Sequence, residues 1–446
     1  MNSSESWCEK RTSKSLFFYL GFVLWVTLFI ALQNKSNLLF VGKLSTIHLY
    51  IMITILIFRS FKARNSLYTI FFAFIAMYVN PARLYFFDGI YLSAHHQVYT
   101  YYTTTYTTLI FSLFLLSINL FLIVPKGGVI VLNFRKNDCL FWCLYILACF
   151  IVCVFRRTGN IYAGDSNEVS SLNEYVIILF LVCYIFSNDE KIKRYYLYLL
   201  YALYAFFAII TGGRVELVLL FFLLLTTVLQ QKYSFRFLIS VFLLGILVMN
   251  IFGNIRHNPL ILLEGDVVSI ISPFKTTSMS VQASNEGDVY WASERLLCLM
   301  EDGELTLLNR IESAFSYIIS PLFPSSFLPE TADLSSYKKD ILSTGGGNLA
   351  PVNFFVMYGF VGVIFLAYFI SYMLNSLSKR KGNVLRIYTI LMITTLPRWF
   401  AYNPIQLVKL CLWGVICYYL VICVDYTMKK HMNKHKFKEM QLFFQK

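Results

Sequence analysis

The sequence predicts an all-α, polytopic membrane protein. The 446 residues are 58% hydrophobic and 18% aromatic, only 14% are charged, and the mean hydropathy is +0.63. Apolar runs recur along the whole chain, and most have the length of about 20 residues that a helix needs to cross the hydrocarbon core. The first run lacks the small-residue cleavage site of a signal peptide, and more spans follow it.

We expect about twelve transmembrane helices and one long connection. Helices one to nine occupy residues 1–252, a long loop occupies 253–349, helices ten to twelve occupy 350–425, and a basic tail occupies 426–446. The expected helices cover 16–32, 38–58, 67–87, 107–124, 139–155, 173–187, 195–210, 214–230, 235–252, 350–375, 384–401 and 405–424.

The distribution of basic residues predicts the orientation. With the N-terminus inside, the cytoplasmic segments hold 24 of the 38 Lys and Arg residues, while the outer short loops and helix ends hold eight. Cytoplasmic loops carry the excess of Lys and Arg in membrane proteins, so both termini are expected in the cytoplasm. Basic ends that face anionic lipid also explain the net charge of +14 without nucleic acid.

The basic residues expected on the outer face are mostly arginines. The arginines of interest are Arg156, Arg157, Arg214 and Arg398, together with Arg256 just past the ninth expected helix. Translocation disfavours cations there, but a guanidinium binds phosphate oxygens in a bidentate manner. We therefore expect these side chains to bind an anionic group at the membrane surface. The alternative is that they reach lipid headgroups or pair with nearby carboxylates such as Asp165, Glu168, Glu174 and Glu216.

The stretch "TGGRVE" places Gly212 and Gly213 in a tight outward turn directly before Arg214. Glycine permits the turn, and the N-terminus of the following helix is positively polarised, so the sequence predicts an anion site here. A hairpin turn requires glycine for its own sake as well.

The long loop mixes apolar stretches with turn signals, and it is too long to be a simple connector. We expect short amphipathic helices that pack on the outer surface over a cavity. The loop ends in "GGGNLAPVNFFVMYGFVGVI", where Asn348 is a polar candidate for substrate contact and Gly359 and Gly362 suggest close helix packing.

A loop rich in Tyr and Thr precedes the fourth expected helix. Tyr101 and Tyr102 are candidates for stacking on sugar rings, although an aromatic belt at the interface explains the same composition. His95 and His96 lack acidic or cysteine partners, so no metal site is expected. The ten cysteines show no metal-binding pattern, and nearly all are interpreted as small apolar residues within or beside the spans.

This layout, with "TGGR" in an outward hairpin, "GGGNLAPVNFFVMYGFVGVI" entering the tenth helix and "PRWFAYNP" before the last, resembles the bacterial O-antigen polymerases, the Wzy-type oligosaccharide repeat-unit polymerases. The resemblance implies an inner-membrane glycosyltransferase that builds surface polysaccharide, a step of lipopolysaccharide biosynthesis, from undecaprenyl-pyrophosphate-linked repeat units on the periplasmic face. It implies no cofactor, and it implies a chain-length regulator and other polysaccharide-assembly membrane proteins as partners. Outward arginines are functional in that family; this role carries over best to Arg214.

A pyrophosphate is already a good leaving group, so the main tasks are to neutralise its charge and to position the acceptor hydroxyl. Arginines perform the first task without a metal. His257, Glu216 and Asp165 are candidates for a general base by location.

Two alternatives stay open. An O-antigen ligase-like transferase uses the same lipid donor and the same kind of arginine. A flippase or transporter of lipid-linked oligosaccharide has a similar number of helices, but no inverted repeat is evident and the arginines concentrate on one face. A metal-dependent lipid-phosphate-sugar transferase is disfavoured, because the first outer loop is only "QNKSN".

Overall fold

The computed structural model describes most of the chain. The described residues are 3–90, 100–127, 130, 132–155, 171–188, 190–211, 213–257, 275–278, 281–283, 285–323, 327–334, 337, 347–378 and 383–444. Within these ranges, side chains are not described for 3–15, 171, 249–250, 252–257, 275–285 and 431–444.

The described chain is helical, apart from a short hairpin of strands β1 (Lys275–Ser278) and β2 (Val281–Ala283), which pair antiparallel. The prediction of a multi-pass helical protein is therefore confirmed in its coarse form. Seven helical segments are long and apolar enough to cross a membrane. They are Leu16–Gln33, Leu38–Lys62, Ser66–Asp88, Tyr101–Phe121, Arg214–Lys232, Ala350–Leu377 and Ile405–Lys430.

The other expected spans correspond to shorter or less apolar helices. Four apolar helices of 10–17 residues lie at Asp138–Val154, Leu172–Phe186, Phe235–Val248 and Asn383–Thr394, and α8 covers Lys191–Ile210. Two expected helices are interrupted before a proline. The segment 67–87 becomes α3 (Ser66–Met77), α4 (Asn80–Arg83) and the π-helix η1 (Leu84–Asp88); 384–401 becomes α18 (Asn383–Thr394) and α19 (Leu396–Ala401). Proline favours the first turn of a helix and disrupts its interior.

The chain divides into two compact units. Unit 1 comprises 1–129, 232–381 and 395–408, and unit 2 comprises 130–231, 382–394 and 409–446.

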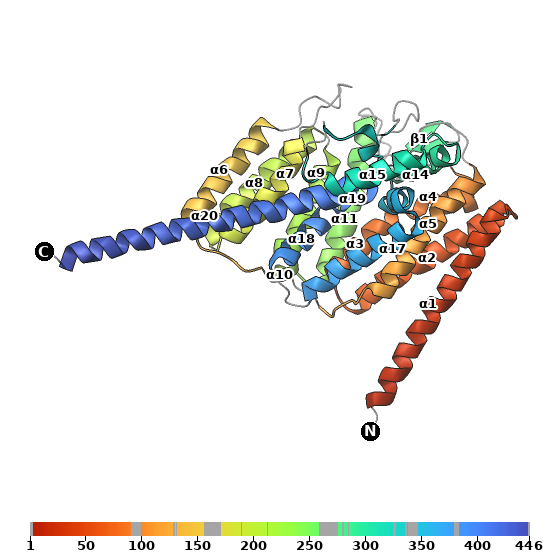
Figure 1. The fold of residues 1–446 in the computed structure, drawn as a ribbon, viewed down its shortest axis with the longest axis horizontal. Coiled ribbons are helices and arrows are strands. Elements are labelled where there is room, and N and C mark those ends of the chain that lie inside the picture. Colours follow the sequence, from red (N-terminus) through yellow and green to blue (C-terminus); the bar gives the residue numbers. More distant parts are fainter. Residues whose placement is uncertain are drawn as a thin grey trace. The chain divides into compact units, whose positions relative to one another are not determined.

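Unit 1 is built around α5 (Tyr101–Phe121), which packs against α1 (Ser3–Gln33), α2 (Leu38–Lys62) and α17 (Ala350–Ser378) (Figure 1). Every residue of α5 from Thr103 to Asn119 is buried. Hydroxyl groups of Thr104, Thr105 and Thr108 donate to carbonyls four residues earlier, which satisfies them inside the helix. The Tyr/Thr-rich stretch was expected to be a loop as far as residue 106; from Tyr101 onward it forms the first turns of a buried helix instead.

Unit 1 also contains α11 (Phe235–His257), α14 (Asn285–Glu301), α15 (Leu307–Ile319) and the 3₁₀ helix η5 (Glu330–Ala332). The expectation of short helices between 253 and 349 is met by α14 and α15. The helix α11 extends to His257, beyond the expected end at 252. Asn258-Pro259 comes next in the sequence, and a proline disfavours the helical conformation in the residue before it.

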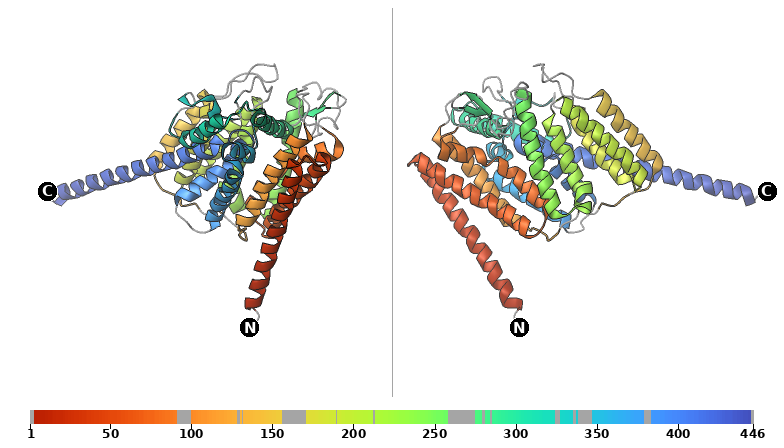
Figure 2. Two further views of the ribbon diagram at one scale, coloured as in Figure 1. Left: turned by 45° about the vertical axis from the view of Figure 1, so that its right-hand side comes forward. Right: turned by 180° about the vertical axis from the view of Figure 1, so that it is seen from behind.

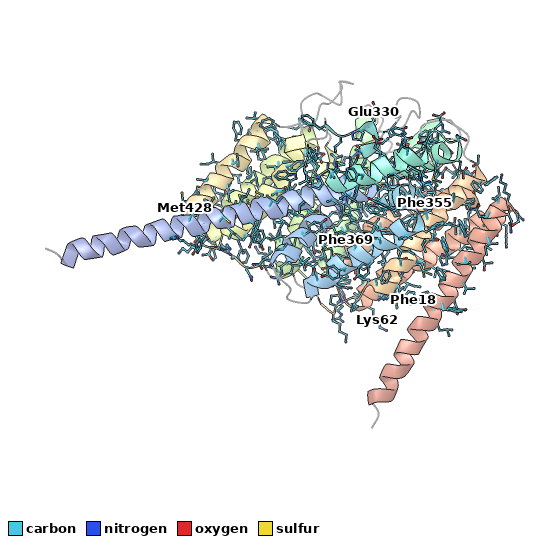
Figure 3. All side chains as sticks on the ribbon, in the orientation of Figure 1. Phe18, Lys62, Glu330, Phe355, Phe369 and Met428 are labelled. Atoms are coloured by element: carbon cyan, nitrogen blue, oxygen red, sulfur yellow. The ribbon has the colours of Figure 1, made fainter. Side chains whose placement is uncertain are left out.

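The helix α17 is broken at Gly359, whose φ of 67° and ψ of −159° lie in a region that only glycine adopts readily. A Cβ on Gly362 would lie 2.5 Å from the carbonyl oxygen of Phe354. These glycines were expected to serve packing between helices; they instead permit the break within α17. In Figure 3, Phe355 and Phe369 mark the parts of α17 before and after it.

Unit 2 contains α6 (Asp138–Val154), α7 (Ser171–Phe186), α8, α9 (Arg214–Leu224), the π-helix η3 (Leu225–Leu229), α10 (Gln230–Lys232) as far as Gln231, α18 and most of α20 (Ile405–Phe444). The views in Figure 2 show α6 to α9 side by side, and α7 is buried throughout from Val176 to Phe186. Lys193 on α8 forms ion pairs with Asp138 (2.5 Å) and Glu190 (2.9 Å).

The nine cysteines described form no disulfide among themselves. Cys183 and Cys411 are buried, as expected of small apolar residues, whereas Cys139, Cys143 and Cys153 are exposed on the surface of α6.

Candidate functional site

The turn between α8 and α9 in unit 2 forms the candidate site. The Thr211 hydroxyl donates to the carbonyl of Phe207 (2.8 Å), and the Gly213 amide donates to the carbonyl of Ala208 (2.7 Å). This second bond joins an amide to a carbonyl five residues earlier, which is the closing bond of a Schellman-type helix end. The chain then turns within two residues, because α9 begins at Arg214.

Glu216 lies folded back against the start of its own helix. Its side chain is only 2% exposed, and a Cβ added to Gly213 would lie 2.6 Å from Oε2 of Glu216. Both carboxylate oxygens are buried without a hydrogen-bond partner among the described residues. Leaving such a group unpaired is costly, so it calls for a further partner. Glycine is therefore required at position 213, because any side chain there would collide with the carboxylate of Glu216.

A small cavity of about 10 Å³ adjoins Glu216, with room for roughly one water molecule. The residues that line it come from four helices and the turn, and they are Val152, Asn173, Tyr204, Phe207, Ala208, Thr211 and Glu216. Three of these seven side chains are apolar, and four carry a polar group, namely those of Asn173, Tyr204, Thr211 and Glu216. Glu216 thus faces an enclosed space beside the turn.

Arg214 is the first residue of α9, and its side chain is partly exposed. It forms no ion pair or hydrogen bond with another residue in the part of the chain that the structure describes. A cation at a helix N-terminus opposes the helix dipole and costs about 0.3–1 kcal/mol. An arginine without a partner among the described residues is a candidate ligand for an external anion.

The site differs from its prediction in one respect. The positively polarised end of α9 was expected to receive an external anion through its backbone amides, but the carboxylate of Glu216 already lies there. A negative side chain in the first turn is itself favourable to the helix. The first turn of α9 thus carries a partly exposed arginine and, two residues later, a buried carboxylate.

Unit 1 brings together two of the predicted residues at Tyr402. The guanidinium of Arg398, on α19, lies 5.7 Å from the ring centre of Tyr402. The backbone amide of Asn348 donates to the Tyr402 carbonyl (3.3 Å). A Cβ on Gly347 would lie 2.8 Å from the carbonyl oxygen of Ala401, so only glycine fits this approach. Tyr402 was not predicted, although it lies within "PRWFAYNP".

The described contacts of Asn348 are with the protein itself. The residue is 2% exposed. Its side-chain amide donates to the backbone carbonyl of Leu334 (3.0 Å) and to Oδ1 of Asn353 (3.4 Å). These bonds fix the entry to α17. The expected contact with substrate stays a prediction.

The two tyrosines lie on the first turn of α5. Tyr101 is 46% exposed and packs beside Tyr85 and Phe86, while Tyr102 packs edge-on against Tyr106 (6.0 Å between ring centres). Both are anchored by neighbouring side chains, and a contact with sugar stays a prediction.

For several predicted site residues, the structure describes no side chain. Arg156, Arg157, Asp165, Glu168, Gly212, His95 and His96 lie outside the described residues altogether. The backbone of Arg256 and His257 forms the last turn of α11, and their side chains are not described. Arg256 was expected to follow the ninth helix, which was expected to end at residue 252. This was wrong, because Arg256 lies within α11.

Two further polar groups in unit 1 were missed. Glu294 on α14 is 2% exposed, and Arg310 on α15 donates from Nε to the Val356 carbonyl (2.6 Å). In the sequence, Glu294 and Arg310 are each a charged residue within an apolar stretch of the long loop, and this was the signal that could have singled them out. Among the described residues, no three His, Cys, Asp or Glu side chains form a group that could hold a metal ion.

Comparison with family models, with curated proteins and with solved structures finds no match to this chain.

Proposed function

We propose that the protein polymerises undecaprenyl-pyrophosphate-linked O-antigen repeat units on the periplasmic face of the bacterial inner membrane. The reaction is a metal-independent glycosyl transfer: an acceptor hydroxyl attacks the anomeric carbon of the donor glycan, and the lipid pyrophosphate leaves. The proposal combines the resemblance of the sequence motifs with the geometry of the turn between α8 and α9.

The single observation that carries the proposal is Arg214. Its partly exposed guanidinium has no partner among the described residues, and it directly follows a tight turn between two apolar helices. A fixed guanidinium stabilises charge that develops on a leaving phosphate, and such preorganised charge is the largest single term in many enzymes. Arg214 is the residue that binds the pyrophosphate in this proposal.

Glu216 is the second member of the proposed site. Its buried carboxylate has no hydrogen-bond partner among the described residues, and it lies on the same turn of α9 as Arg214. A carboxylate in this environment is a suitable acceptor for the proton of the attacking hydroxyl. His257 is the alternative base, and Arg156, Arg157, Arg256 and Arg398 are further proposed phosphate ligands.

The proposed topology has twelve transmembrane helices with both termini in the cytoplasm. It is supported by the bias of Lys and Arg along the sequence and by the helices that overlap each expected segment. In this topology the turn at Thr211–Arg214 faces the periplasm, where lipid-linked repeat units are joined. A chain-length regulator and other membrane proteins of polysaccharide assembly are the proposed partners.

A ligase-like transferase is the second candidate, because an outward arginine with no partner among the described residues suits the same lipid donor. A flippase is the third. The test is the surface polysaccharide of cells that lack this gene, separated on a gel, with and without a plasmid copy. A ladder that collapses to core bearing one repeat unit supports polymerisation. Loss of all attached repeats, with lipid-linked material accumulating, would indicate a ligase or flippase instead.

A further inference from the structure

One face of α15 is apolar and exposed along its whole length. Exposed fractions are 76% for Leu308, 56% for Ile311, 64% for Phe315 and 65% for Ile318. These four positions recur every three or four residues, so they lie on one side of the helix. Leu322, in the turn after the helix, is 73% exposed as well. Solvent-facing helices of globular proteins have the opposite pattern.

The other face of α15 binds it to α17. Ser313, Ser316 and Tyr317 are buried, and Tyr317 packs edge-on against Phe354 (5.2 Å between ring centres). Arg310 donates to the carbonyl of Val356 (2.6 Å), and the Tyr358 hydroxyl donates to the carbonyl of Ala314 (2.8 Å). The polar side of α15 is therefore used within the protein, and the apolar side is turned away from it.

The point of attachment of α15 lies on a candidate span. Val356 and Tyr358 belong to the apolar segment Ala350–Leu377, just before the break in α17 at Gly359. A helix fixed to a candidate span lies beside the bilayer, where interfacial amphipathic helices turn their apolar face toward the acyl chains.

The surface beyond the attachment has the same character. Val361 and Phe365 on α17, within two turns of Tyr358, are 76% and 58% exposed. Side chains of the candidate spans that face lipid are expected to be exposed in this way, and the exposed stripe on α15 has the same apolar character.

We propose that α15 lies in the membrane interface, with Leu308, Ile311, Phe315 and Ile318, and Leu322 of the turn that follows, inserted among the lipid acyl chains. The occupant of this face is the bilayer, and not water, a cavity or a second copy of the chain. The long segment between α11 and α17 is then held at the membrane surface by one of its own helices. This inference does not depend on the proposed enzymatic function.

The test is photo-crosslinking of the full chain in vesicles of phosphatidylethanolamine and phosphatidylglycerol. Benzoylphenylalanine replaces Phe315 or, in a second variant, Ile318; Phe365 on α17 is the positive control and exposed Asp302 the control for a water-facing site. After irradiation, mass spectrometry is expected to show an added phospholipid at 315, 318 and 365 and none at 302. Absence of lipid adducts at both 315 and 318, with or without a cross-linked dimer, would overturn the proposal, provided that 365 reacts.

Discussion

The guanidinium of Arg310 caps the carbonyl of Val356, three residues before the break in α17 at Gly359 (2.6 Å). A break in a helix leaves preceding carbonyls without their amide partners, and inside a membrane every such group must be satisfied within the protein. Arg310 supplies that bond from a different helix. The sequence shows neither the break nor its cap.

Removal of this cap should destabilise the fold. Arg310→Met keeps much of the apolar stem but leaves the Val356 carbonyl unpaired, and the expected loss is about 1–3 kcal/mol of unfolding free energy. Thermal unfolding of the purified protein in detergent measures it. Arg236→Met is the matched control, since Arg236 is exposed on α11, and it should change little. Equal stability of the two variants would rule out a capping role.

Glycine should be required at position 359 and dispensable at position 245. Gly359→Ala forces a Cβ onto a φ of 67° and ψ of −159°, at an expected cost of about 1–3 kcal/mol. Gly245 lies inside α11 with no atom within 4 Å of an added Cβ, so Gly245→Ala should stabilise by up to about 1 kcal/mol. Unfolding temperatures that shift in opposite directions would confirm the contrast; the same direction for both would refute it.

Burial raises the pKa of Glu294 well above its usual range, and a hydrogen bond from Thr104 only partly offsets this. The folded state therefore holds the proton more tightly than the unfolded state, whose carboxyl titrates near 4.5. The contribution of Glu294 to stability is present below that pH and declines as the pH rises above it. Glu294→Gln should thus be more stable than the natural protein at pH 8, and the difference should fade toward pH 4.5. Chemical denaturation at both values tests the sign.

Glu216 should matter to activity through its charge. Glu216→Gln keeps the shape beside Gly213 but cannot accept a proton, and chain growth is expected to fall about 100-fold or more. Glu190→Gln is the control, because Glu190 is ion-paired with Lys193 at the other end of α8. Quantified polysaccharide ladders, at matched protein levels in the membrane, provide the measurement. Full activity of Glu216→Gln would assign its role to packing alone.

Hydropathy predicted the helical class and the approximate place of the long apolar helices, because apolar length is a strong and local signal. It could not predict how α5 begins: the Tyr/Thr-rich stretch is polar, yet Thr104, Thr105 and Thr108 satisfy their hydroxyls within the helix. The break at Gly359 was missed because glycines in a span suit both packing and irregular backbone.

The candidate site was predicted in part. The "TGGR" pattern indicated a tight turn, and the structure has one at Gly213 and Arg214. The burial of Glu216 against Gly213 was not foreseeable, since it depends on residues of α6, α7 and α8 that close the cavity. Likewise, the meeting of Asn348 and Arg398 at Tyr402 depends on tertiary packing within unit 1.

The most direct test of the proposed function is the polymer length formed by Arg214 variants. Arg214→Ala should abolish chain growth while the protein remains in the membrane at normal levels. Arg214→Lys should restore it only in part, because a point charge does not replace the bidentate guanidinium. Arg236→Ala, an exposed arginine of α11, should leave the ladder intact. A full-length ladder from Arg214→Ala would contradict the assignment of Arg214 to the lipid pyrophosphate.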